Sequence, residues 1–333
     1  MRAENKKLHN LISKSKKILL LTHRGPDLDA FCSMLILFRI LRKHYSKKEV
    51  VMQAKQLPNT NLHNMHDISQ VQQLNSTGFD LIIITDAGDI DMCMEKNGDH
   101  IEYESTPLVF IDHHKTELIQ PNGTLVINNL ASSATEEVYT TFKDILGKKL
   151  SMDKEIAELI QFGIVFDTER FLYENTTSNS MRLFAEAKDV SPIDLEEFTY
   201  KYAKFPIEAT PAIIEYLKSL KTEKDMAYMS ISKEKVKELN LNRQGINEAQ
   251  SYLRDRYLRF IQGIHWGFII RPDFELEDGW YVSFRSIKGY QEVAPIAEEL
   301  GGGGHTYAAG LRIEGKTEAE VLEKVLTVVR KYL

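Results

Sequence analysis

Residues 18–29 read Ile-Leu-Leu-Leu-Thr-His-Arg-Gly-Pro-Asp-Leu-Asp, a short apolar run that is followed at once by a polar turn. Two later stretches repeat this order: residues 81–84 precede Asp86, and residues 108–111 precede Asp112-His113-His114. Runs of branched apolar residues that end in turn formers are typical of strands buried in a parallel sheet. Because ligands of an open α/β sheet gather at the carboxyl ends of its strands, we expect these polar side chains to meet.

The side chains expected at the strand ends are mostly carboxylates and imidazoles. Asp167, which follows a helical pattern over residues 154–165, is expected to lie with them. Taken alone, Asp86 after its strand is most simply a helix N-cap, and residues 112–114 could be a solvated turn. All the clusters together would repel one another unless cations compensated their charge. The sequence therefore predicts a metal-dependent active site.

The bulk properties agree with an ordinary globular protein of two domains. The chain has 333 residues, of which 43% are hydrophobic and 27% charged, and domains usually contain roughly 100–200 residues. Its 48 acidic and 42 basic residues give a net charge of −6, which disfavours extended duplex binding but permits a small phosphate ligand. Cys32 and Cys93 provide no disulfide framework. Without an apolar run near the ~20 residues of a membrane span, and with a Lys-rich start unlike a secretory signal, a cytoplasmic location is expected.

The order of patterns along the chain predicts an α/β protein. Residues 1–190 alternate strand and helix patterns, which indicates a mostly parallel sheet. Residues 191–222 form a helical connector, and residues 223–333 a smaller α/β domain. In that domain we expect strands at 227–231, 263–270 and 280–285 and near Leu311, helices at 245–254, 293–300 and 318–333, and a glycine loop at 301–304.

The four Asp and His clusters resemble those of the DHH phosphoesterases. Ser283-Phe284-Arg285-Ser286, the run 301–305 and Ala308-Ala309-Gly310 resemble the DHHA1 domain that one branch of this family carries. The resemblance covers nearly the whole chain, and its compact length is closest to the nanoRNase and phosphoadenosine-phosphate phosphatase proteins. It implies an N-terminal DHH metal-binding catalytic domain, a C-terminal DHHA1 substrate-binding domain, an active-site cleft between them and, as a possibility, a homodimer.

The resemblance also implies a role for each matching residue. One ion would be held by His23, Asp27 and Asp86, and the other by Asp29, Asp86, His113 and Asp167, so that Asp86 bridges both. Asp86, Asp112 and His114 would form the catalytic set: Asp112 orients a ligand and His114 faces the phosphate. Carboxylates combined with imidazoles favour Mn²⁺ over Mg²⁺, with Co²⁺ as a possible substitute. Two such ions would activate a shared water for in-line attack.

A flanking stretch, residues 132–136, is predicted to cap and pack a helix rather than to take part in chemistry.

Four successive glycines can bring the backbone close to an anion and present amide groups to it, although a plain flexible turn would read the same. The flanking Arg, Ser and His residues favour phosphate binding, and Trp280, Tyr290 or Tyr307 could stack on a base if they are not core residues. The predicted substrate-binding residues are Arg285, Ser286, Gly302, Gly303, Gly304, His305 and Arg170. Glu169 stands where the family commonly has glycine, and Phe166 where it commonly has threonine; these departures put the choice of substrate in doubt, and Arg170 could simply pair with Glu169.

The expected function is therefore Mn²⁺-dependent hydrolysis of very short oligonucleotides such as pApA to mononucleotides, together with removal of a phosphate from adenosine bisphosphate (pAp). Three alternatives remain open. The chain could be a single-stranded DNA or RNA exonuclease of RecJ type, or a polyphosphate or pyrophosphate hydrolase. It could also be a non-catalytic nucleotide-binding regulator, although every expected metal-ligand position is filled.

Overall fold

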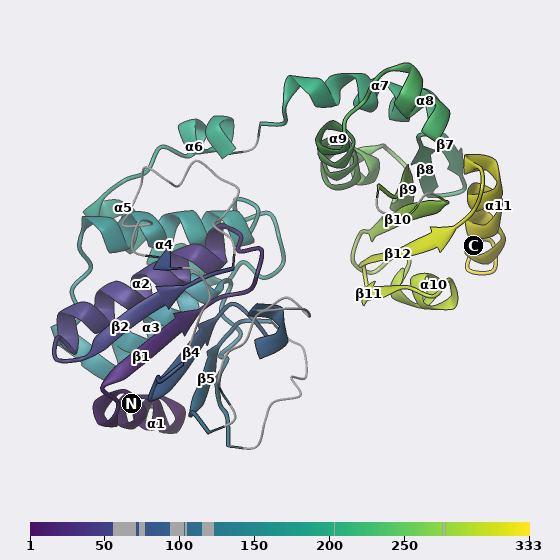
Figure 1. The fold of residues 1–333 in the computed structure, drawn as a ribbon. Helices are drawn as coiled ribbons and strands as arrows, with labels where there is room; N and C mark the ends of the chain where they lie inside the picture. The colour runs from purple at the N-terminus through teal and green to yellow at the C-terminus, as the bar shows by residue number, and fades with distance from the viewer. Residues whose placement is uncertain are drawn as a thin grey trace. The chain divides into compact units, whose positions relative to one another are not determined.

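The computed structural model describes residues 1–55, 71–72, 77–93, 103, 105–114, 123–202, 204–274, 276 and 278–333 (Figure 1). The chain forms two compact units, Met1–Tyr202 and Ala203–Leu333. The division between them falls inside the connector expected over residues 191–222. Every helix among the described residues is too short or too polar to cross a membrane.

The first unit is built on a six-stranded sheet in the order β3-β2-β1-β4-β5-β6, in which all neighbouring strands are parallel. The order reverses between β1 and β4, and ligands of such sheets bind outside the carboxyl ends of the strands at this reversal. Leu21 pairs with Ile84, and Thr85 pairs with Ile111, so the three strands end at nearly the same level. The strands are β1 (Lys17–Leu21), β2 (Glu49–Gln53), β3 (Val71–Gln72), β4 (Leu81–Thr85), β5 (Leu108–Ile111) and β6 (Leu125–Ile127).

Apolar side chains cover both faces of this sheet, which explains why its strands read as continuous apolar runs. Ile18 and Leu20 of β1 pack into a core formed with the helices, whereas Leu19 and Leu21 pack on the opposite face with Ile90 and other residues. The helices and 3₁₀ turns are α1 (Ala3–Lys14), α2 (Leu28–His44), η3 (Ile90–Cys93), α3 (Ala134–Leu146), η4 (Gly147–Lys149), α4 (Lys154–Asp167), α5 (Ser178–Val190) and α6 (Leu195–Tyr202).

Helix α1 was not predicted, because its sequence is Lys-rich and polar. Its buried face consists of Asn5, Leu8 and Ile12, and a stripe this short gives a weak periodic pattern. Leu8 and Ile12 join the core that α2, α3 and α4 form.

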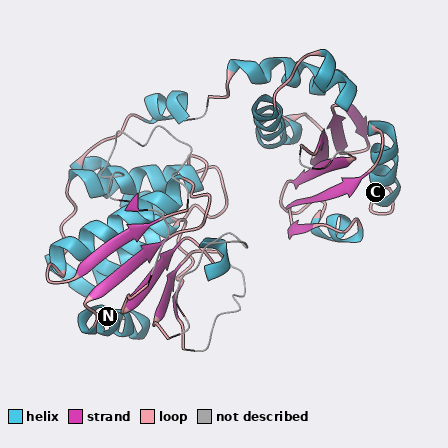
Figure 2. Ribbon diagram, viewed as in Figure 1, coloured by secondary structure: helices cyan, strands magenta, loops and turns pink. Residues whose placement is uncertain are grey.

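The second unit has a mixed six-stranded sheet in the order β11-β12-β10-β9-β8-β7 (Figure 2). Neighbouring strands are antiparallel except for β8 and β9, which are parallel. Its elements are η5 (Ile207–Ala209), α7 (Thr210–Ser219), β7 (Lys221–Glu223), β8 (Met226–Ser230), α8 (Lys233–Glu238), α9 (Arg243–Arg256), η6 (Leu258–Phe260), β9 (Trp266–Pro272), β10 (Gly279–Ser286), α10 (Ala294–Glu299), β11 (Gly303–His305), β12 (Ala308–Glu314) and α11 (Glu318–Val329).

The two faces of this sheet pack against different helices. Trp280, Val282 and Phe284 of β10 join the core that α10 and α11 cover, while Ile269 of β9 joins the core of α7 and α9. Trp280 is fully buried, and its Nε1 donates to the carbonyl oxygen of Gly315 at 2.7 Å. It is therefore a core residue, and the suggestion that it stacks on a base is wrong.

The glycine run differs from the loop that was expected over residues 301–304. Gly303, Gly304 and His305 form the edge strand β11, which pairs with Gly310, Ala309 and Ala308 of β12. A Cβ on Gly304, whose φ is +147°, would lie 2.6 Å from the carbonyl oxygen of Ala308. The second half of the run is therefore a close-packed strand whose glycine at position 304 is required by its neighbours.

Candidate metal centre

Asp86 lies at the point where the strand order reverses. It follows β4 directly, and its backbone N–H donates to the carbonyl oxygen of Ile111 at 3.1 Å. Its φ of 55° places it in the left-handed region, which a residue other than glycine adopts only when its surroundings hold it there. The side chain is 4% exposed, so the strand end holds a buried carboxylate in a strained turn.

The two oxygens of this carboxylate face different imidazoles. Oδ1 of Asp86 lies 3.4 Å from Nε2 of His113, and Oδ2 lies 3.8 Å from Nε2 of His23. Among the described residues, neither Asp86 Oδ1 nor His113 Nε2 has a hydrogen-bond partner, although both atoms are buried. Leaving a buried polar atom unpaired costs about 1–3 kcal/mol, and a cation between these atoms would remove that cost.

His23, Asp27 and Asp86 form one group of potential metal ligands, with ligand atoms all within 4.8 Å of one another. Asp27 is also the N-cap of α2, where Oδ1 accepts from the backbone N–H of Ala30 at 3.0 Å. The cap orients this carboxylate at the beginning of the helix.

Asp29, His113 and Asp167 form a second group of the same kind. Asp29 is fully buried, and its two oxygens accept from the backbone N–H groups of Ala134, at 2.6 Å, and Thr135, at 3.1 Å. These amides belong to the first turn of α3, where the helix dipole stabilises negative charge. The amino end of α3 therefore holds Asp29 in place.

Residues 132–136 make that helix end rigid. Ser133 is the N-cap of α3 and accepts from the backbone N–H of Glu136 at 3.1 Å, while the N–H and Oγ of Ser132 donate to the Glu136 carboxylate. The capping role predicted for this stretch is confirmed, and it bears on the site because the same helix end holds Asp29.

Asp167 ends α4, and Nε2 of His113 lies 3.4 Å from its Oδ2. Asn175 was not predicted, yet its Nδ2 donates to Oδ2 of Asp167 at 3.3 Å, to the carbonyl oxygen of Asp167 at 3.1 Å and to that of Ser132 at 2.8 Å. Asn175 lies just before helix α5 (Ser178–Val190). Polar residues are common at such positions, so the local sequence did not identify Asn175 as part of the site.

Three consecutive residues after Asp167 adopt left-handed backbone angles: Glu169 has a φ of 47°, Arg170 of 61° and Phe171 of 67°. The guanidinium of Arg170 pairs with the Glu169 carboxylate, as one of the two alternatives for Arg170 expected. Phe171 packs edge-on against Phe184 of α5, with the two ring centroids 5.1 Å apart. This contact anchors the turn.

Asp112 and His114 form a hydrogen-bonded pair beside Asp86. Nδ1 of His114 lies 2.8 Å from Oδ1 of the fully buried Asp112, whereas the His114 side chain is 49% exposed. This hydrogen bond raises the pKa of His114. Burial alone would raise the pKa of Asp112, but the hydrogen bond and charge of His114, with a smaller contribution from His113, lower it below its ordinary value. The pair therefore favours a charged imidazole with one face toward solvent.

The pKa values of Asp86, Asp167 and Asp29 are shifted in the opposite direction. Burial, followed by the charge of Asp29, raises the pKa of Asp86 well above its usual range, and the same causes raise the pKa of Asp167 to about 8. Burial also raises the pKa of Asp29. Three carboxyl groups that resist ionisation beside two unpaired ligand atoms fit divalent cations, and their mixture of oxygen and imidazole ligands suits ions softer than Mg²⁺.

The predicted metal and catalytic residues thus come together in the first unit, while all predicted substrate-binding residues except Arg170 lie in the second. Arg285 of β10 pairs across the sheet with Ala308, which in turn pairs with His305. Arg285 and His305 therefore share one row of the sheet. Ser286 is buried, and its Oγ donates to the carbonyl oxygen of Ile287 at 3.1 Å.

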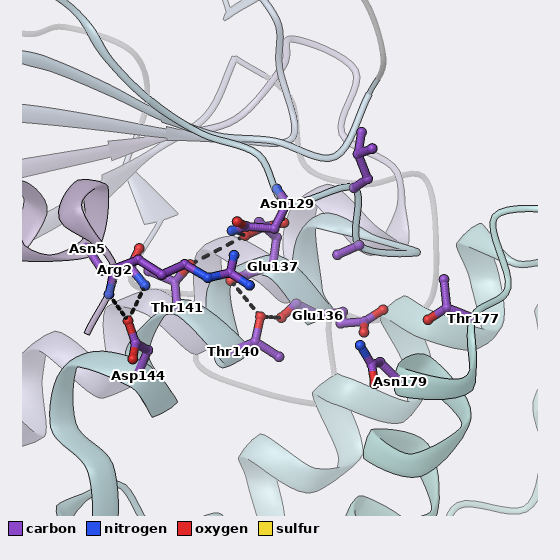
Figure 3. A pocket seen from close by; sticks show the side chains of 12 residues that line it. Arg2, Asn5, Asn129, Glu136, Glu137, Thr140, Thr141, Asp144, Thr177 and Asn179 are labelled. Atoms are coloured by element: carbon purple, nitrogen blue, oxygen red, sulfur yellow. Dashed lines mark hydrogen bonds between the residues drawn. The ribbon is translucent and has the colours of Figure 1, made fainter.

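A cavity of about 300 Å³ lies against α3 in the first unit (Figure 3). It is polar: Glu137 in its wall accepts from the backbone N–H of Asn129 at 2.8 Å, and Asp144 accepts from Nδ2 of Asn5. None of the predicted site residues lines it. The cavity borders residues 129–131, which come between β6 and α3, and it is separate from the metal ligands.

The comparisons with known proteins agree with these observations. Residues 17–164 match the DHH family, N-terminal domain. The chain is 29% identical over 325 residues to the bifunctional oligoribonuclease and PAP phosphatase NrnA of Bacillus subtilis (strain 168), covering 96% of this chain and 97% of that protein. The probable bifunctional oligoribonuclease and PAP phosphatase NrnA of Streptococcus mutans is 25% identical to this chain over 309 residues. The match covers 91% of this chain and 91% of that protein.

One solved structure supports the fold over the whole chain. An exopolyphosphatase-related protein from Bacteroides fragilis superposes with a TM-score of 0.82 at 21% identity and covers 100% of this chain and 97% of its own. The predicted α/β fold is confirmed. Residues 17–164, which are similar to the DHH family, N-terminal domain, contain every predicted metal ligand except Asp167.

Proposed function

We propose that this protein is a metal-dependent phosphoesterase that hydrolyses very short oligonucleotides such as pApA to mononucleotides and also removes the 3′-phosphate of pAp. The observation that carries the proposal is the position of the Asp86 carboxylate between His23 and His113, with unpaired buried atoms on Asp86 and His113. The names of the B. subtilis and S. mutans relatives support the choice of substrate.

In this proposal His23, Asp27 and Asp86 would hold one divalent ion, and Asp29, Asp86, His113 and Asp167 would hold the other. The ligand set favours Mn²⁺. Bound ions of this kind act as Lewis acids on the phosphoryl group and activate water for in-line attack on phosphorus.

The chain's own residues then have separate tasks. His114, whose pKa is raised by its hydrogen bond to Asp112, presents a charged N–H donor to a phosphoryl oxygen and stabilises the negative charge that grows there. Asp112 fixes the orientation of the imidazole. The amino end of α3 and the side chain of Asn175 keep Asp29 and Asp167 in position. Residues 223–333 would act as a DHHA1 domain in which Arg285 binds a phosphate of the substrate.

The test is an activity panel on the full chain with Mn²⁺ and with chelator. Its substrates are pApA, pAp, an RNA pentamer, single-stranded DNA and polyphosphate. We expect turnover of pApA and pAp, loss of turnover with chelator, and loss of at least about a thousandfold in Asp86→Ala, because both proposed ions share this residue. Asp91→Ala, which removes an exposed carboxylate from η3, is the matched control and should keep its activity.

Failure to cut any dinucleotide with Mn²⁺ would refute the proposal. Preferred turnover of polyphosphate or of long single-stranded DNA would replace it with the corresponding alternative. Full turnover in Asp86→Ala would contradict the two-metal site.

A further inference from the structure

Gly163 lies where three helices of the first unit meet. It is a buried residue in the interior of α4, and α2, α3 and α4 all contact one another around the same core (Figure 1). A Cβ at this position would lie 2.2 Å from Oγ1 and 2.6 Å from Cβ of Thr135, and 2.7 Å from Oδ1 of Asp29. Glycine in a helix interior costs about 1 kcal/mol relative to alanine, and this close approach is the physical reason for a glycine here.

The atoms nearest to Gly163 belong to a potential metal ligand and to the helix end that holds it. Thr135 lies in the first turn of α3, where its backbone N–H donates to Oδ1 of Asp29 at 3.1 Å and its Oγ1 donates to the carbonyl oxygen of Asp29 at 3.4 Å. Both residues are fully buried. Oδ1 of Asp29 therefore lies between the amino end of α3 and the bare backbone of α4.

Rotation of side chains cannot make room for a methyl group at position 163. Cβ of Thr135 is fixed to its backbone, and the two oxygens of Asp29 are held by the N–H groups of Ala134 and Thr135. Ordinary contact begins at about 3.4 Å, so the contacts of 2.6 and 2.7 Å are too short by about 0.7–0.8 Å. Only a displacement of α4 away from α2 and α3 would relieve them.

Such a displacement would be transferred to Asp167. This residue follows Gly163 by four positions on α4 and therefore lies on the same face of the helix. The ligand atoms of Asp29, His113 and Asp167 all lie within 4.8 Å of one another. Metal–ligand distances tolerate changes of only about ±0.2 Å, which is less than the displacement of α4. The backbone at position 163 therefore sets the spacing between the carboxylates of Asp29 and Asp167.

The other group of potential ligands does not depend on α4. His23 follows β1, Asp27 is the N-cap of α2, and Asp86 follows β4. A shift of α4 would change the geometry of one group and leave the other as it is.

We propose that Gly163 is a positioning residue for the Asp29, His113 and Asp167 group. The missing side chain lets α4 bring Asp167 close enough to Asp29 for both carboxylates to bind one divalent ion. The inference rests on the proposed function for the presence of two ions. It adds a residue that contacts neither substrate nor ion and acts only through the spacing of two ligands.

The test counts bound Mn²⁺ in the absence of substrate. The full chain and Gly163→Ala are stripped of metal and titrated with Mn²⁺, and the free ion is measured by electron paramagnetic resonance. We expect the natural chain to bind two ions. Gly163→Ala should bind one ion with unchanged affinity and the other roughly tenfold to a hundredfold more weakly, the range for residues that orient metal ligands. The spin-coupled spectrum of two adjacent Mn²⁺ ions should be lost in the variant at the same Mn²⁺ concentration.

Ala157→Val is the matched control. Ala157 is also a buried residue of α4, and it lies about 9 Å along the helix from Gly163 and on another face. The added methyl groups overpack the same helix, so the urea midpoint should fall while both ions still bind. Equal weakening of one ion in Ala157→Val and Gly163→Ala would overturn the role, because it would show a general effect of α4 packing. Unchanged affinity for both ions in Gly163→Ala would overturn it as well.

A second variant covers the case in which Gly163→Ala does not fold, which would appear as the loss of a cooperative urea transition in chelator. Thr135→Gly removes the two nearest atoms, Oγ1 and Cβ, and keeps the backbone N–H that donates to Asp29. In Gly163→Ala/Thr135→Gly the contact of 2.7 Å with Asp29 remains. One ion should therefore bind more weakly than in Thr135→Gly alone, and equal binding in these two proteins would overturn the role.

The inference and the proposed function can fail separately. Selective weakening of one ion in Gly163→Ala, in a chain that hydrolyses no phosphoester, refutes the proposed function alone. Hydrolysis of pApA by a chain whose Mn²⁺ binding is identical in Gly163→Ala refutes the positioning role alone. A natural chain that binds a single ion refutes both.

Discussion

Oδ1 of Asp86 and Nε2 of His113 lie 3.4 Å apart, and among the described residues neither buried atom has a hydrogen-bond partner. Two ligands that each approach an ion at roughly 2.1 Å in a tetrahedral or octahedral arrangement are themselves about 3–3.5 Å apart. The distance between these two atoms therefore fits two ligands of one ion better than it fits a well-formed hydrogen bond.

Divalent metal should stabilise the fold through Asp86. We expect Mn²⁺ to raise the melting temperature of the chelator-treated chain and to fail to do so in Asp86→Asn, which keeps the shape but removes the bridging charge. Differential scanning calorimetry checks this. In the absence of metal, Asp86→Asn should be at least as stable as the natural chain at neutral pH, because it removes a buried carboxyl group whose pKa is raised by burial. A metal-induced rise of the same size in both proteins would contradict the prediction.

The metal-free chain should lose stability as the pH rises. Asp167 has a pKa of about 8 in the folded chain against an ordinary value of 3.8, so the folded state keeps a proton that the unfolded state releases. The resulting stabilisation is complete below about pH 4 and is lost progressively up to about pH 8. Urea unfolding in chelator at several pH values between 5 and 8.5 measures the slope, and Asp167→Asn should flatten it. A slope identical in both proteins would refute the assignment.

Asn175 should tune metal affinity without taking part in the reaction. Asn175→Ala removes the donor that links Asp167 to the backbone of Ser132. Residues that orient metal ligands typically contribute 10-fold to 100-fold in metal affinity, so we expect the Mn²⁺ concentration for half-maximal activity to rise by about that factor, with kcat at saturating metal largely kept. Asn179→Ala, in the first turn of α5, is the control. A lower kcat at saturating Mn²⁺, with unchanged metal affinity, would contradict this role.

The parts of this site that were predictable from sequence are those in which the functional residue directly follows an element with a strong pattern. His23, Asp86 and His113 follow apolar strands, and the parallel register then brings the strand ends together. The contact of Asn175 with Asp167 and the contact of the amino end of α3 with Asp29 could not be found in this way, because no periodic pattern in the sequence connects these residues.

The edge strand of the second unit's sheet could not be predicted either, because its local sequence has no pattern. The glycine run carries no side-chain pattern, so nothing local distinguishes a loop from the edge strand β11. The surroundings of Arg285 were likewise not predicted, because Arg254 and Arg259 come from a different segment of the chain and contact the same residue, Asp255, as Arg285 does.

Adjacent glycines of β11 should respond differently to the same substitution. In Gly304→Ala the new Cβ would lie 2.6 Å from both the carbonyl oxygen of Ala308 and Cα of Ala309, at a φ that side chains rarely adopt. We expect it to destabilise the second unit by about 1–3 kcal/mol. The new Cβ of Gly303→Ala would meet no atom within 4 Å, so this variant should leave the urea midpoint unchanged. Equal destabilisation by the two variants would show that β11 is not packed against β12 as described.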